Sequence, residues 1–454
     1  MLKLESYKRK YFGTDGVRDI AFQGNMTQAF AYALGMSYAR WNKSTEQDSL
    51  PIAIGMDTRI SGEVLAKSLA QGIVAAGGKV VFLGVLPTPG VSFVLKNGKF
   101  AGGAMVSASH NPWQYNGIKF FHGDGFKLSD KDEFEIEEIF DKVYDKNLVV
   151  NTDEVIWQDG TKLGQLYLDK LVSTFGAVKG YNKKLVVDAS NGAASAFVKP
   201  LFSHWDGEVI FLANSPDGKN INENVGVMHL DNLKAVVLKE HADLGIAFDG
   251  DTDRVLMCDA KGRTIDGDIM MLVVSRYLAA TNKLGAGLVA TIMSNMTLVD
   301  HLAEEGIVTY RTDVGDRYVL EKMKETGSRL GGEQSGHIIA FDVANTGDGM
   351  ASAILFLTAL SYLKEDLNTL VDRFNPYPQL LINKTVKDKN AVMASPILKQ
   401  AEKEAAALLG QKGRMSLRPS GTEPLVRIFV ESRDAELMRY VASIMEGAID
   451  SIVS

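Results

Sequence analysis

The chain has 454 residues, of which 46% are hydrophobic and 23% are charged, values typical of a globular protein with about three domains. A formal net charge of −7 offers no basic face for a phosphate backbone, so we expect no nucleic-acid partner. The single cysteine, Cys258, excludes an intramolecular disulfide. The first residues, MLKLESYKRKYFGTDG, lack the apolar core of a signal peptide or anchor, so we expect a cytoplasmic protein with no membrane partner.

The first third of the chain alternates between helical and strand patterns. Thr27 is the expected N-cap of a helix whose apolar residues recur on one face. Residues 51–57 then predict a strand, 63–78 a helix ended by glycines, and 79–86 another strand. This βαβ unit predicts a mostly parallel sheet. The apolar face of the first helix consists of Phe30, Leu34, Tyr38 and Trp41.

The same order of elements returns twice along the chain. The second unit begins with the strand in 183–194 and reaches 243–250, and the third extends from the strand in 287–295 to the helix in 317–327. The most apolar segment, 349–363, is too short to cross about 30 Å of hydrocarbon and predicts a buried helix.

A different pattern follows NPYPQLL (375–381), whose prolines resist helix: strand, long helix, two strands and helix. We therefore predict an α/β fold of three similar domains with mixed sheets, followed by a smaller α+β domain. The expected boundaries are 1–160, 161–259, 260–374 and 375–454.

Three aspartates alternate directly after an apolar segment in FDGDTDRV (248–255): Asp249, Asp251 and Asp253. Unit charges about 4 Å apart repel by about 4 kcal/mol at an effective dielectric constant of 20, so these carboxylates need a cation or full solvation. Oxygen ligands suit Mg²⁺ before Zn²⁺. A calcium EF-hand is disfavoured, because Arg254 and Ala260 occupy its Gly and Glu positions. A solvated acidic turn is the alternative, but the apolar segments on both sides favour a metal site.

Two further polar loops could bind an anion or a sugar. LRPSGTEPLVRI (417–428) can direct hydroxyl and backbone N–H groups at an anion between two arginines. RLGGEQSGHIIA (329–340) places alternating polar side chains between glycines, a pattern suited to sugar hydroxyls. Taken alone, a tight turn explains either loop equally well.

The segment GAMVSASHNP (103–112) joins an apolar run to a polar cluster. Ser109 and His110 are adjacent, and because adjacent side chains generally point apart, we do not expect them to form a serine–histidine dyad. Ser109 as the cap of a turn with Asn111 is the alternative. With the other three loops, however, a nucleophilic serine completes the components needed for phosphoryl transfer on a sugar phosphate.

Over essentially its whole length the chain resembles the α-D-phosphohexomutases. The resemblance implies four domains around a central cleft, each contributing one loop. The matching motifs are KYFGTDGVR (10–18), SASHNP (107–112), NGIKFF (116–121), FDGDTDR (248–254), MSNM (293–296), VGDRYV (314–319), GGEQSGH (331–337) and RPSGTEP (418–424).

The resemblance also implies roles for residues at the matching positions. Ser109 would carry the transferable phosphate, and one of its phosphate oxygens would join the three aspartates in holding one Mg²⁺. Lys119 and His337 would transfer protons or stabilise charge. The groups around the reacting phosphate would be Arg18, His110 and Arg254. The sugar hydroxyls would be bound by Glu333 and Ser335, and the non-reacting phosphate by Arg418, Ser420, Gly421, Thr422 and Arg427.

Two positions imply the substrate. Asp316 in VGDRYV and Gln334 in GEQSGH imply a glucosamine phosphate, because mannose- and glucose-specific relatives usually carry His and Met there. Gln334, if its side chain points inward, would offer its carbonyl oxygen to the ammonium group of that substrate. The chain departs from the family at Thr252 and Asp19, where glycine is usual, and these residues could alter the metal loop and the local charge.

The implied activity interconverts glucosamine 6-phosphate and glucosamine 1-phosphate through a phosphoserine and a 1,6-bisphosphate, in the synthesis of cell-wall precursors. A hexose 1,6-bisphosphate would prime the enzyme, and a homodimer is possible. The alternatives are a mutase of mannose or glucose phosphate and a non-catalytic sugar-phosphate-binding protein.

Overall fold

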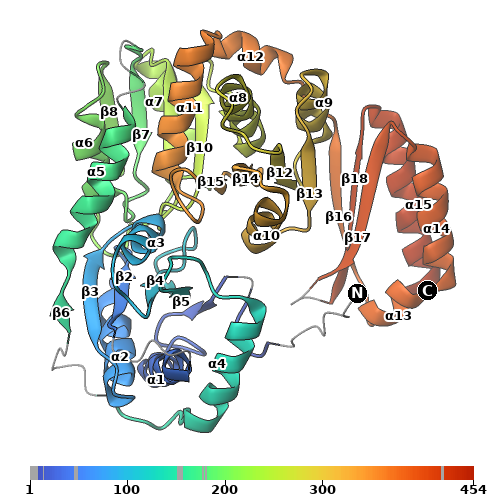
Figure 1. Ribbon diagram of the computed structural model, residues 1–454. Helices are drawn as coiled ribbons and strands as arrows, with labels where there is room; N and C mark the ends of the chain where they lie inside the picture. Colours follow the sequence, from blue (N-terminus) through green and yellow to red (C-terminus); the bar gives the residue numbers. More distant parts are fainter. Residues whose placement is uncertain are drawn as a thin grey trace. The chain divides into compact units, whose positions relative to one another are not determined.

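The computed structural model describes residues 9–13, 15–44, 50–150, 157–175, 178, 181–420 and 424–453. These residues form two compact units (Figure 1). The larger unit contains the described residues up to Met293 together with Ile307–Leu370, and the smaller one contains Ser294–Gly306 and the chain from Val371 onward.

The first sheet of the larger unit has strand order β1-β5-β4-β2-β3-β6. β4, β2, β3 and β6 are parallel, as predicted, whereas β5 and β1 add two antiparallel strands at one edge. The strands are β1 (Val17–Ile20), β2 (Ile52–Met56), β3 (Val80–Val85), β4 (Gly102–Val106), β5 (Tyr115–His122) and β6 (Gln158–Asp159).

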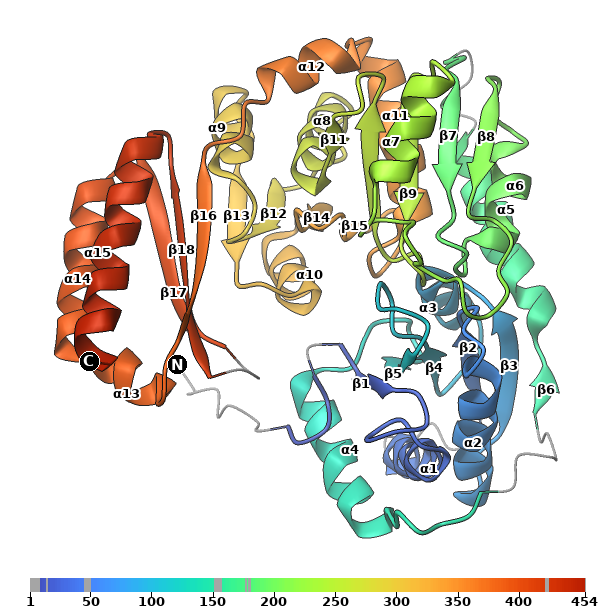
Figure 2. The same cartoon turned by 180° about the vertical axis from the view of Figure 1, so that it is seen from behind.

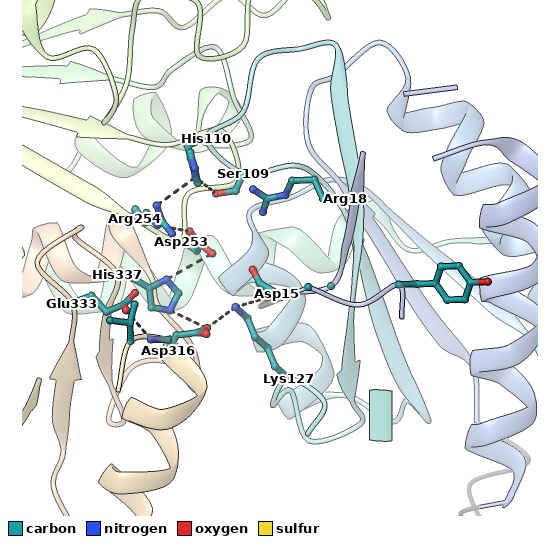
Figure 3. Close-up of a pocket in the computed structure, with 15 residues that line it drawn as sticks. Asp15, Arg18, Ser109, His110, Lys127, Asp253, Arg254, Asp316, Glu333 and His337 are labelled. Atoms are coloured by element: carbon teal, nitrogen blue, oxygen red, sulfur yellow. Dashed lines mark hydrogen bonds and ion pairs between the residues drawn. The ribbon is translucent and has the colours of Figure 1, made fainter. Parts of the chain in front are cut away.

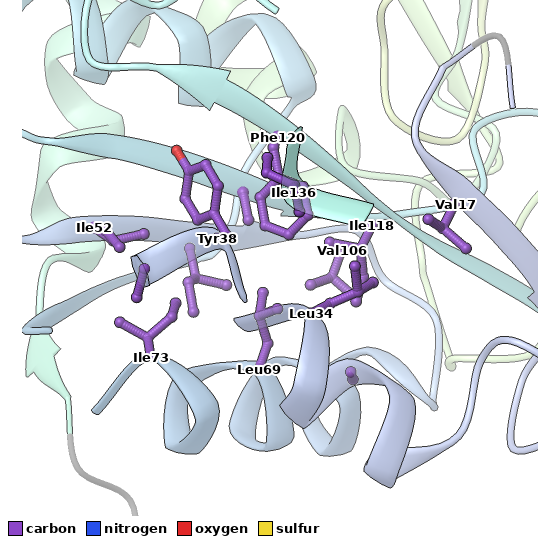
Figure 4. Packing of buried hydrophobic residues seen from close by; sticks show 14 of the residues in the cluster. Val17, Leu34, Tyr38, Ile52, Leu69, Ile73, Val106, Ile118, Phe120 and Ile136 are labelled. Atoms are coloured by element: carbon purple, nitrogen blue, oxygen red, sulfur yellow. The ribbon is translucent and has the colours of Figure 1, made fainter. Parts of the chain in front are cut away.

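Three helices share one apolar cluster with this sheet: α1 (Gln28–Ser44), α2 (Gly62–Ala75) and α4 (Asp130–Val143). Figure 4 shows Leu34 and Leu69 of the helices beside Ile118 of the sheet. α1 begins as expected, because Thr27 Oγ1 accepts a hydrogen bond from the amide of Phe30 at 3.2 Å. The helices α1 and α2 approach closely at Gly72, where a Cβ would lie only 1.9 Å from the carbonyl oxygen of Tyr32.

The second and third sheets repeat this plan. The second, β11-β10-β9-β7-β8, consists of β7 (Leu185–Asp188), β8 (Val209–Leu212), β9 (Leu244–Phe248), β10 (Val255–Asp259) and β11 (Thr264–Ile265). The third, β13-β12-β14-β15, consists of β12 (Leu288–Thr291), β13 (Thr309–Thr312), β14 (Leu330–Gly332) and β15 (Ile338–Ala340). In each of these sheets, a parallel strand is followed along the chain by an antiparallel neighbour: β9 by β10 and β14 by β15. The pair β4 and β5 has the same arrangement in the first sheet.

The remaining helices of the larger unit are α3 (Thr88–Asn97), α5 (Gly164–Phe175), α6 (Ser195–Phe202), α7 (Asp231–Lys239), α8 (Gly267–Ala280), α10 (Asp316–Thr326) and α11 (Gly349–Leu363), with η1 (Thr161–Leu163) and the start of α12 (Leu367–Arg373). The apolar segment predicted as a buried helix is α11, which contacts α5, α8, β10 and β15. In the part of the chain that the structure describes, no helix has both the length and the apolar character needed to cross a membrane.

The smaller unit has an antiparallel sheet of order β16-β18-β17. Its strands are β16 (Gln379–Thr385), β17 (Gly413–Pro419) and β18 (Leu425–Ser432), and its helices are α9 (Met296–Glu304), α13 (Lys389–Ala394), α14 (Pro396–Leu409) and α15 (Ala435–Val453). Figure 2 shows α14 and α15 on one side of this sheet. Val426, Ile428 and Val430 of β18 face the core that these helices share, so the alternate residues of β18 lie on the other face. The predicted fold class is confirmed, whereas the domain boundaries stay a prediction.

Candidate active site

The larger unit contains a pocket of about 460 Å³ that is lined by loops from all three of its sheets. Three of the loops each join a parallel strand to its antiparallel neighbour: 107–114 between β4 and β5, 249–254 between β9 and β10, and 333–337 between β14 and β15. These loops contain the polar motifs recognised in the sequence. Equivalent turns of three similar sheets therefore deliver the candidate residues to one pocket (Figure 3).

Ser109 is buried at 2% exposure and adopts a φ of 50°, in the left-handed region that a residue other than glycine seldom occupies. Its hydroxyl donates a hydrogen bond to Asp249 Oδ2 at 2.7 Å and lies 3.2 Å from Nδ1 of His110. The expectation that Ser109 and His110 point apart is therefore wrong. It assumed an ordinary backbone, whereas the left-handed conformation of Ser109 brings the two side chains together.

Two side chains that the sequence analysis missed hold this loop in place. The Arg59 guanidinium donates from Nε to Asp57 and from its two terminal nitrogens to the backbone carbonyls of residues 109, 111, 112 and 115. All five N–H donors of the guanidinium are therefore used inside the protein. Asn222 donates to the carbonyls of Ser109 and Asn111 from the second sheet's side. A strained residue persists only where its surroundings determine it this strongly.

The three aspartates of the 249–254 loop are buried, and oxygens from all three lie within 4.8 Å of one another. Burial, together with Asp253 and Asp251, raises the pKa of Asp249 well above its ordinary value. Burial also acts against ionisation of Asp253, but Lys119 and His337 outweigh it and hold the pKa of Asp253 well below its ordinary range. Oδ1 of Asp251 and Oδ1 of Asp253 are buried and have no hydrogen-bond partner among the described residues. An all-oxygen set with two such atoms fits a hard divalent cation.

Lys119 does not line the pocket, but it pairs with three carboxylates of the site. Its Nζ is 2.9 Å from Asp251 Oδ2, 3.4 Å from Asp253 Oδ2 and 2.7 Å from Asp15 Oδ2. Burial lowers the pKa of Lys119, but the three carboxylates outweigh burial and raise it well above the ordinary value. Lys119 is thus a fixed cation beside the acids.

One end of the pocket, here called the cationic end, consists of Arg18, Ser109, His110 and Arg254. Arg254 Nη1 lies 3.3 Å from His110 Nδ1, and Arg18 donates to Asn111 Oδ1 at 3.3 Å. Burial, with the charges of Arg254 and Arg18, lowers the pKa of His110 to about 4. The imidazole of His110 is therefore neutral near pH 7, beside two cations and the hydroxyl of Ser109.

The opposite end, the acidic end, consists of Asp15, Lys127, Asp316, Glu333 and His337 (Figure 3). Lys127 Nζ pairs with Asp316 Oδ2 at 2.6 Å and with Asp15 Oδ1 at 2.9 Å. His337 Nε2 lies 3.4 Å from Asp316 Oδ2 and accepts a hydrogen bond from the amide of Gly347. Burial lowers the pKa of His337, but Asp253 and Asp316 outweigh it and raise it above the ordinary value. Asp15 and Lys127 had no role in the sequence analysis, although Asp15 falls in the KYFGTDGVR motif.

Two residues of the 333–337 loop do not line this pocket. Ser335 is exposed on the surface of the loop. Gln334 does not point inward, because its amide nitrogen donates to Asp266 Oδ2, at the N-cap of α8. Of the two loop residues predicted to bind sugar hydroxyls, Glu333 lines the pocket and Ser335 does not; His337, predicted to transfer protons or stabilise charge, also lines it.

The two departures from the family pattern have separate structural consequences. Thr252 is fully buried with a φ of 66°, a costly conformation for a β-branched residue, and it belongs to the loop of the three aspartates. Asp19 is not part of the pocket lining. Its carboxylate accepts hydrogen bonds from the amides of Ile20 and Asn25 and thereby fastens the turn after β1.

The predicted anion clamp lies in the smaller unit, on the hairpin of β17 and β18. Arg418 and Arg427 are direct partners in the antiparallel ladder, so their side chains leave the same face of the sheet, opposite α14 and α15. Like charges placed opposite each other are unfavourable, and an anion bound between them removes that cost. Ser420 is buried and its amide donates to the carbonyl of Leu425. Gly421 and Thr422 lie outside the described residues.

Family models identify the class of protein to which this fold and pocket belong. Four models of phosphoglucomutase/phosphomannomutase match in order: α/β/α domain I at residues 9–147, domain II at 165–262, domain III at 266–377 and the C-terminal domain at 381–447. The chain belongs to the phosphoglucomutase/phosphomannomutase family, that is, to the phosphohexomutases.

Individual relatives of known name are phosphoglucosamine mutases. The chain is 40% identical over 444 residues to the phosphoglucosamine mutase of Deinococcus deserti, covering 98% of this chain and 99% of that protein. It is 42% identical over 441 residues to the phosphoglucosamine mutase of Bacillus subtilis, covering 96% and 98%. The predicted phosphohexomutase enzyme is thus confirmed.

Solved structures show the same fold at low sequence identity. A phosphoglucomutase/phosphomannomutase family protein from Burkholderia thailandensis superimposes with a TM-score of 0.79 at 22% identity, covering 97% of each chain. N-acetylphosphoglucosamine mutase from Aspergillus fumigatus, solved in complex with GlcNAc-6P and magnesium, gives a TM-score of 0.65 at 17% identity, covering 99% of this chain and 97% of that one.

Proposed function

We propose that this protein interconverts glucosamine 6-phosphate and glucosamine 1-phosphate by way of a phosphorylated Ser109. The observation that carries the proposal is the position of the Ser109 hydroxyl, which is bonded to Asp249 in a pocket with two arginines at one end and three carboxylates at the other. The similarity to phosphoglucosamine mutases over nearly the whole chain supports the choice of substrate.

In the proposed reaction, phosphoserine 109 transfers its phosphoryl group to the free hydroxyl of the sugar phosphate. The bond from phosphorus to Ser109 Oγ breaks and a bond from phosphorus to the sugar oxygen forms. The sugar hydroxyl gives its proton to a nearby base, and Ser109 Oγ takes up a proton to regenerate the hydroxyl. The resulting 1,6-bisphosphate reorients and returns its other phosphoryl group to Ser109. A hexose 1,6-bisphosphate can load Ser109 by the same second step and is the proposed primer.

The cationic end would stabilise the charge that develops on the transferred group. Arg18 and Arg254 line the pocket beside Ser109, where fixed donors act on the equatorial oxygens of the phosphoryl group. His110 is neutral near pH 7 and adds a polar contact without a further charge. Lys119 and His337 are the proposed groups for proton transfer or charge stabilisation, of which only His337 lines the pocket.

Asp249, Asp251 and Asp253 would hold Mg²⁺, with an oxygen of phosphoserine 109 as a further ligand. When bound, the ion supplies positive charge that stabilises the phosphoryl group during transfer. The remaining buried oxygens without partners support this donor set, and the hydrogen bond between Ser109 and Asp249 places the serine beside it.

The acidic end would recognise the 2-ammonium group of glucosamine. Asp15, Asp316 and Glu333 present three carboxylates there; Lys127 pairs with Asp15 and Asp316, and Lys119 also pairs with Asp15. Because Gln334 is bonded to Asp266 and does not line the pocket, we assign ammonium recognition to Asp316 and Glu333 instead. The hairpin residues Arg418, Ser420 and Arg427, with Gly421 and Thr422, would hold the phosphate that does not react.

The test is a parallel kinetic comparison of glucosamine, glucose and mannose 6-phosphate, each primed with the same hexose 1,6-bisphosphate. The proposal predicts the highest kcat/KM for glucosamine 6-phosphate, with weaker turnover of glucose 6-phosphate. Higher efficiency with mannose or glucose phosphate would replace this proposal with a mutase of the neutral sugars. No turnover of any of the three would favour a binding protein.

A further inference from the structure

Asp251 differs from Asp249 in how its carboxylate is held, and Asp253 resembles Asp251 in leaving its Oδ1 without a hydrogen-bond partner in the described chain. Asp249 receives hydrogen bonds on both oxygens, from Ser109 on Oδ2 and from the amide of Arg254 on Oδ1. Asp251 receives two bonds on Oδ2 and, within the described chain, none on Oδ1. Because both donors bind Oδ2, the lone pairs of Oδ1 remain available to a ligand.

One of the two donors on Oδ2 is Thr88, the first residue of α3. Thr88 Oγ1 donates to Asp251 Oδ2 at 2.6 Å, and the amide of Thr88 donates to the backbone carbonyl of Asp251 at 2.9 Å. The amide lies in the first turn of the helix, where N–H groups have no partner within the helix and are available to another segment. Thr88 is fully buried, and it thus holds Asp251 twice: its hydroxyl binds the side chain and its amide binds the backbone.

The second donor, Lys119, is shared. Its Nζ lies within 3.4 Å of carboxylate oxygens from Asp251, Asp253 and Asp15, so its position is a compromise among three acids. In contrast, the Thr88 hydroxyl has Asp251 as the one hydrogen-bond acceptor recorded for it in the described chain. Of the two donors on Oδ2, Thr88 is thus directed at Asp251, whereas Lys119 is shared among three acids.

We propose that Thr88 is a positioning residue that fixes the orientation of the Asp251 carboxylate, so that Oδ1 faces the divalent cation. The inference rests on the cation site of the proposed function and adds a residue to its outer shell. Partners that orient a metal ligand typically change metal affinity about 10- to 100-fold when they are removed. Replacing Thr88 by Val removes the hydroxyl but keeps the size, the branching and the backbone amide that bonds to Asp251.

The experiment titrates the full-length, metal-stripped protein with Mn²⁺, followed by electron paramagnetic resonance, and with Mg²⁺, followed by calorimetry. Thr88→Val is expected to weaken binding of both ions by about 10- to 100-fold. Thr88→Ser, which keeps the hydroxyl, restores affinity. In turnover assays, Thr88→Val requires more Mg²⁺ for half-maximal activity and recovers at saturating Mg²⁺.

Ser92→Ala is the matched control, because Ser92 is a buried hydroxyl of the same helix that bonds to the carbonyl of Gly125 and not to Asp251. It should bind Mn²⁺ like the wild type. Equal affinity of Thr88→Val and wild type overturns the inference, and so does an equal loss in Thr88→Val and Ser92→Ala, which would show a general effect of α3. If Thr88→Val fails to fold, Thr88→Ala is titrated in its place against the same criteria. A wild type that binds neither ion would instead contradict the cation site of the proposed function.

Discussion

The two ends of the pocket differ in the sign of the charges that line them. Arg18 and Arg254 line the pocket with Ser109 at the cationic end, whereas Asp15, Asp316 and Glu333 line the acidic end, where Lys127 pairs with Asp15 and Asp316 and Lys119 also pairs with Asp15 (Figure 3). A phosphoryl group needs the first environment and an ammonium group needs the second. In the proposed function, a neutral sugar phosphate would therefore use only one end, while an amino-sugar phosphate would use both.

The difference in charge also implies that the two ends of the pocket have different roles in the proposed reaction. In the proposed reaction, groups at the cationic end contact the reacting atoms, so their loss should lower the rate with every substrate. Asp316 and Glu333 at the acidic end are the proposed contacts of the ammonium group, which does not react, so their loss should chiefly change the choice among sugars. The predictions below test this division.

The largest effect is expected from Ser109→Ala. Because this hydroxyl is the proposed carrier of the phosphoryl group, turnover of every sugar phosphate should fall by at least about 10³-fold, a small part of the acceleration that enzymes typically achieve. Steady-state assays with glucosamine and glucose 6-phosphate measure it. The fold should persist, since one hydroxyl is lost, and the unfolding transition of the variant checks this. Activity near that of wild type would remove Ser109 from the mechanism.

Arg254→Met should lower kcat by about 10²- to 10³-fold with all substrates, as expected when one preorganised donor to a transition-state charge is lost. A second readout is independent of catalysis. The positive charge of Arg254 helps to lower the pKa of His110 to about 4, so removing that charge should raise the pKa of His110 toward its ordinary value.

An NMR titration of the His110 ring in wild type and Arg254→Met measures this shift. Protonation of His110 is unfavourable in the folded wild type, so its contribution to stability is present above the ordinary histidine pKa and is lost as the pH falls toward 4. In the variant that loss should be smaller. An unchanged titration would show that Arg254 and His110 do not interact at the cationic end.

Arg59→Lys tests whether the strained serine loop needs its clamp. The lysine can keep the ion pair with Asp57 but cannot bond to four carbonyls, so Ser109 should lose its fixed orientation. Misplacement of a reacting group by about 1 Å can cost about 10²-fold in rate, so we expect a fall in kcat of up to that size with little change in KM. A rise in KM with unchanged kcat would argue against a positioning role for Arg59.

Asp316→Asn should produce the smallest change in rate and the clearest change in preference. A charge-assisted hydrogen bond contributes about 1.5–3 kcal/mol, so the ratio of kcat/KM for glucosamine over glucose 6-phosphate should fall about tenfold or more. Turnover of glucose 6-phosphate, which has no ammonium group, should change less. An equal loss with both sugars would place Asp316 in the chemistry instead of the choice of substrate.

Much of the fold and of the candidate site could be predicted because the signals were local. The aspartates of FDGDTDRV follow an apolar strand within a few residues, and Thr27 caps α1 from the position its spacing indicated. The contacts that complete the site are remote in sequence. Lys127 and Asp316 are 189 residues apart, and Thr88 and Asp251 are 163 apart. Propensity and spacing carry no information about such pairs.

Other failures arose from backbone geometry. The left-handed conformation of Ser109 depends on Arg59 and Asn222, and without it no sequence rule would place the hydroxyl next to the ring of His110. Gln334 would meet the substrate only if its side chain pointed inward, but the loop turns it toward Asp266. In both cases tertiary hydrogen bonds determined a direction that the sequence left open.

The central claim, that Ser109 carries the phosphoryl group, is tested most directly by mass spectrometry of the purified protein after incubation with a hexose 1,6-bisphosphate. The account predicts a mass increase of one phosphoryl group in the wild type, located on the peptide that contains Ser109, and its retention while glucosamine 6-phosphate is turned over, because each cycle returns a phosphoryl group to Ser109. Ser109→Ala should gain no mass. A phosphoryl group on another residue, or none on a wild type that turns over substrate, would contradict the account.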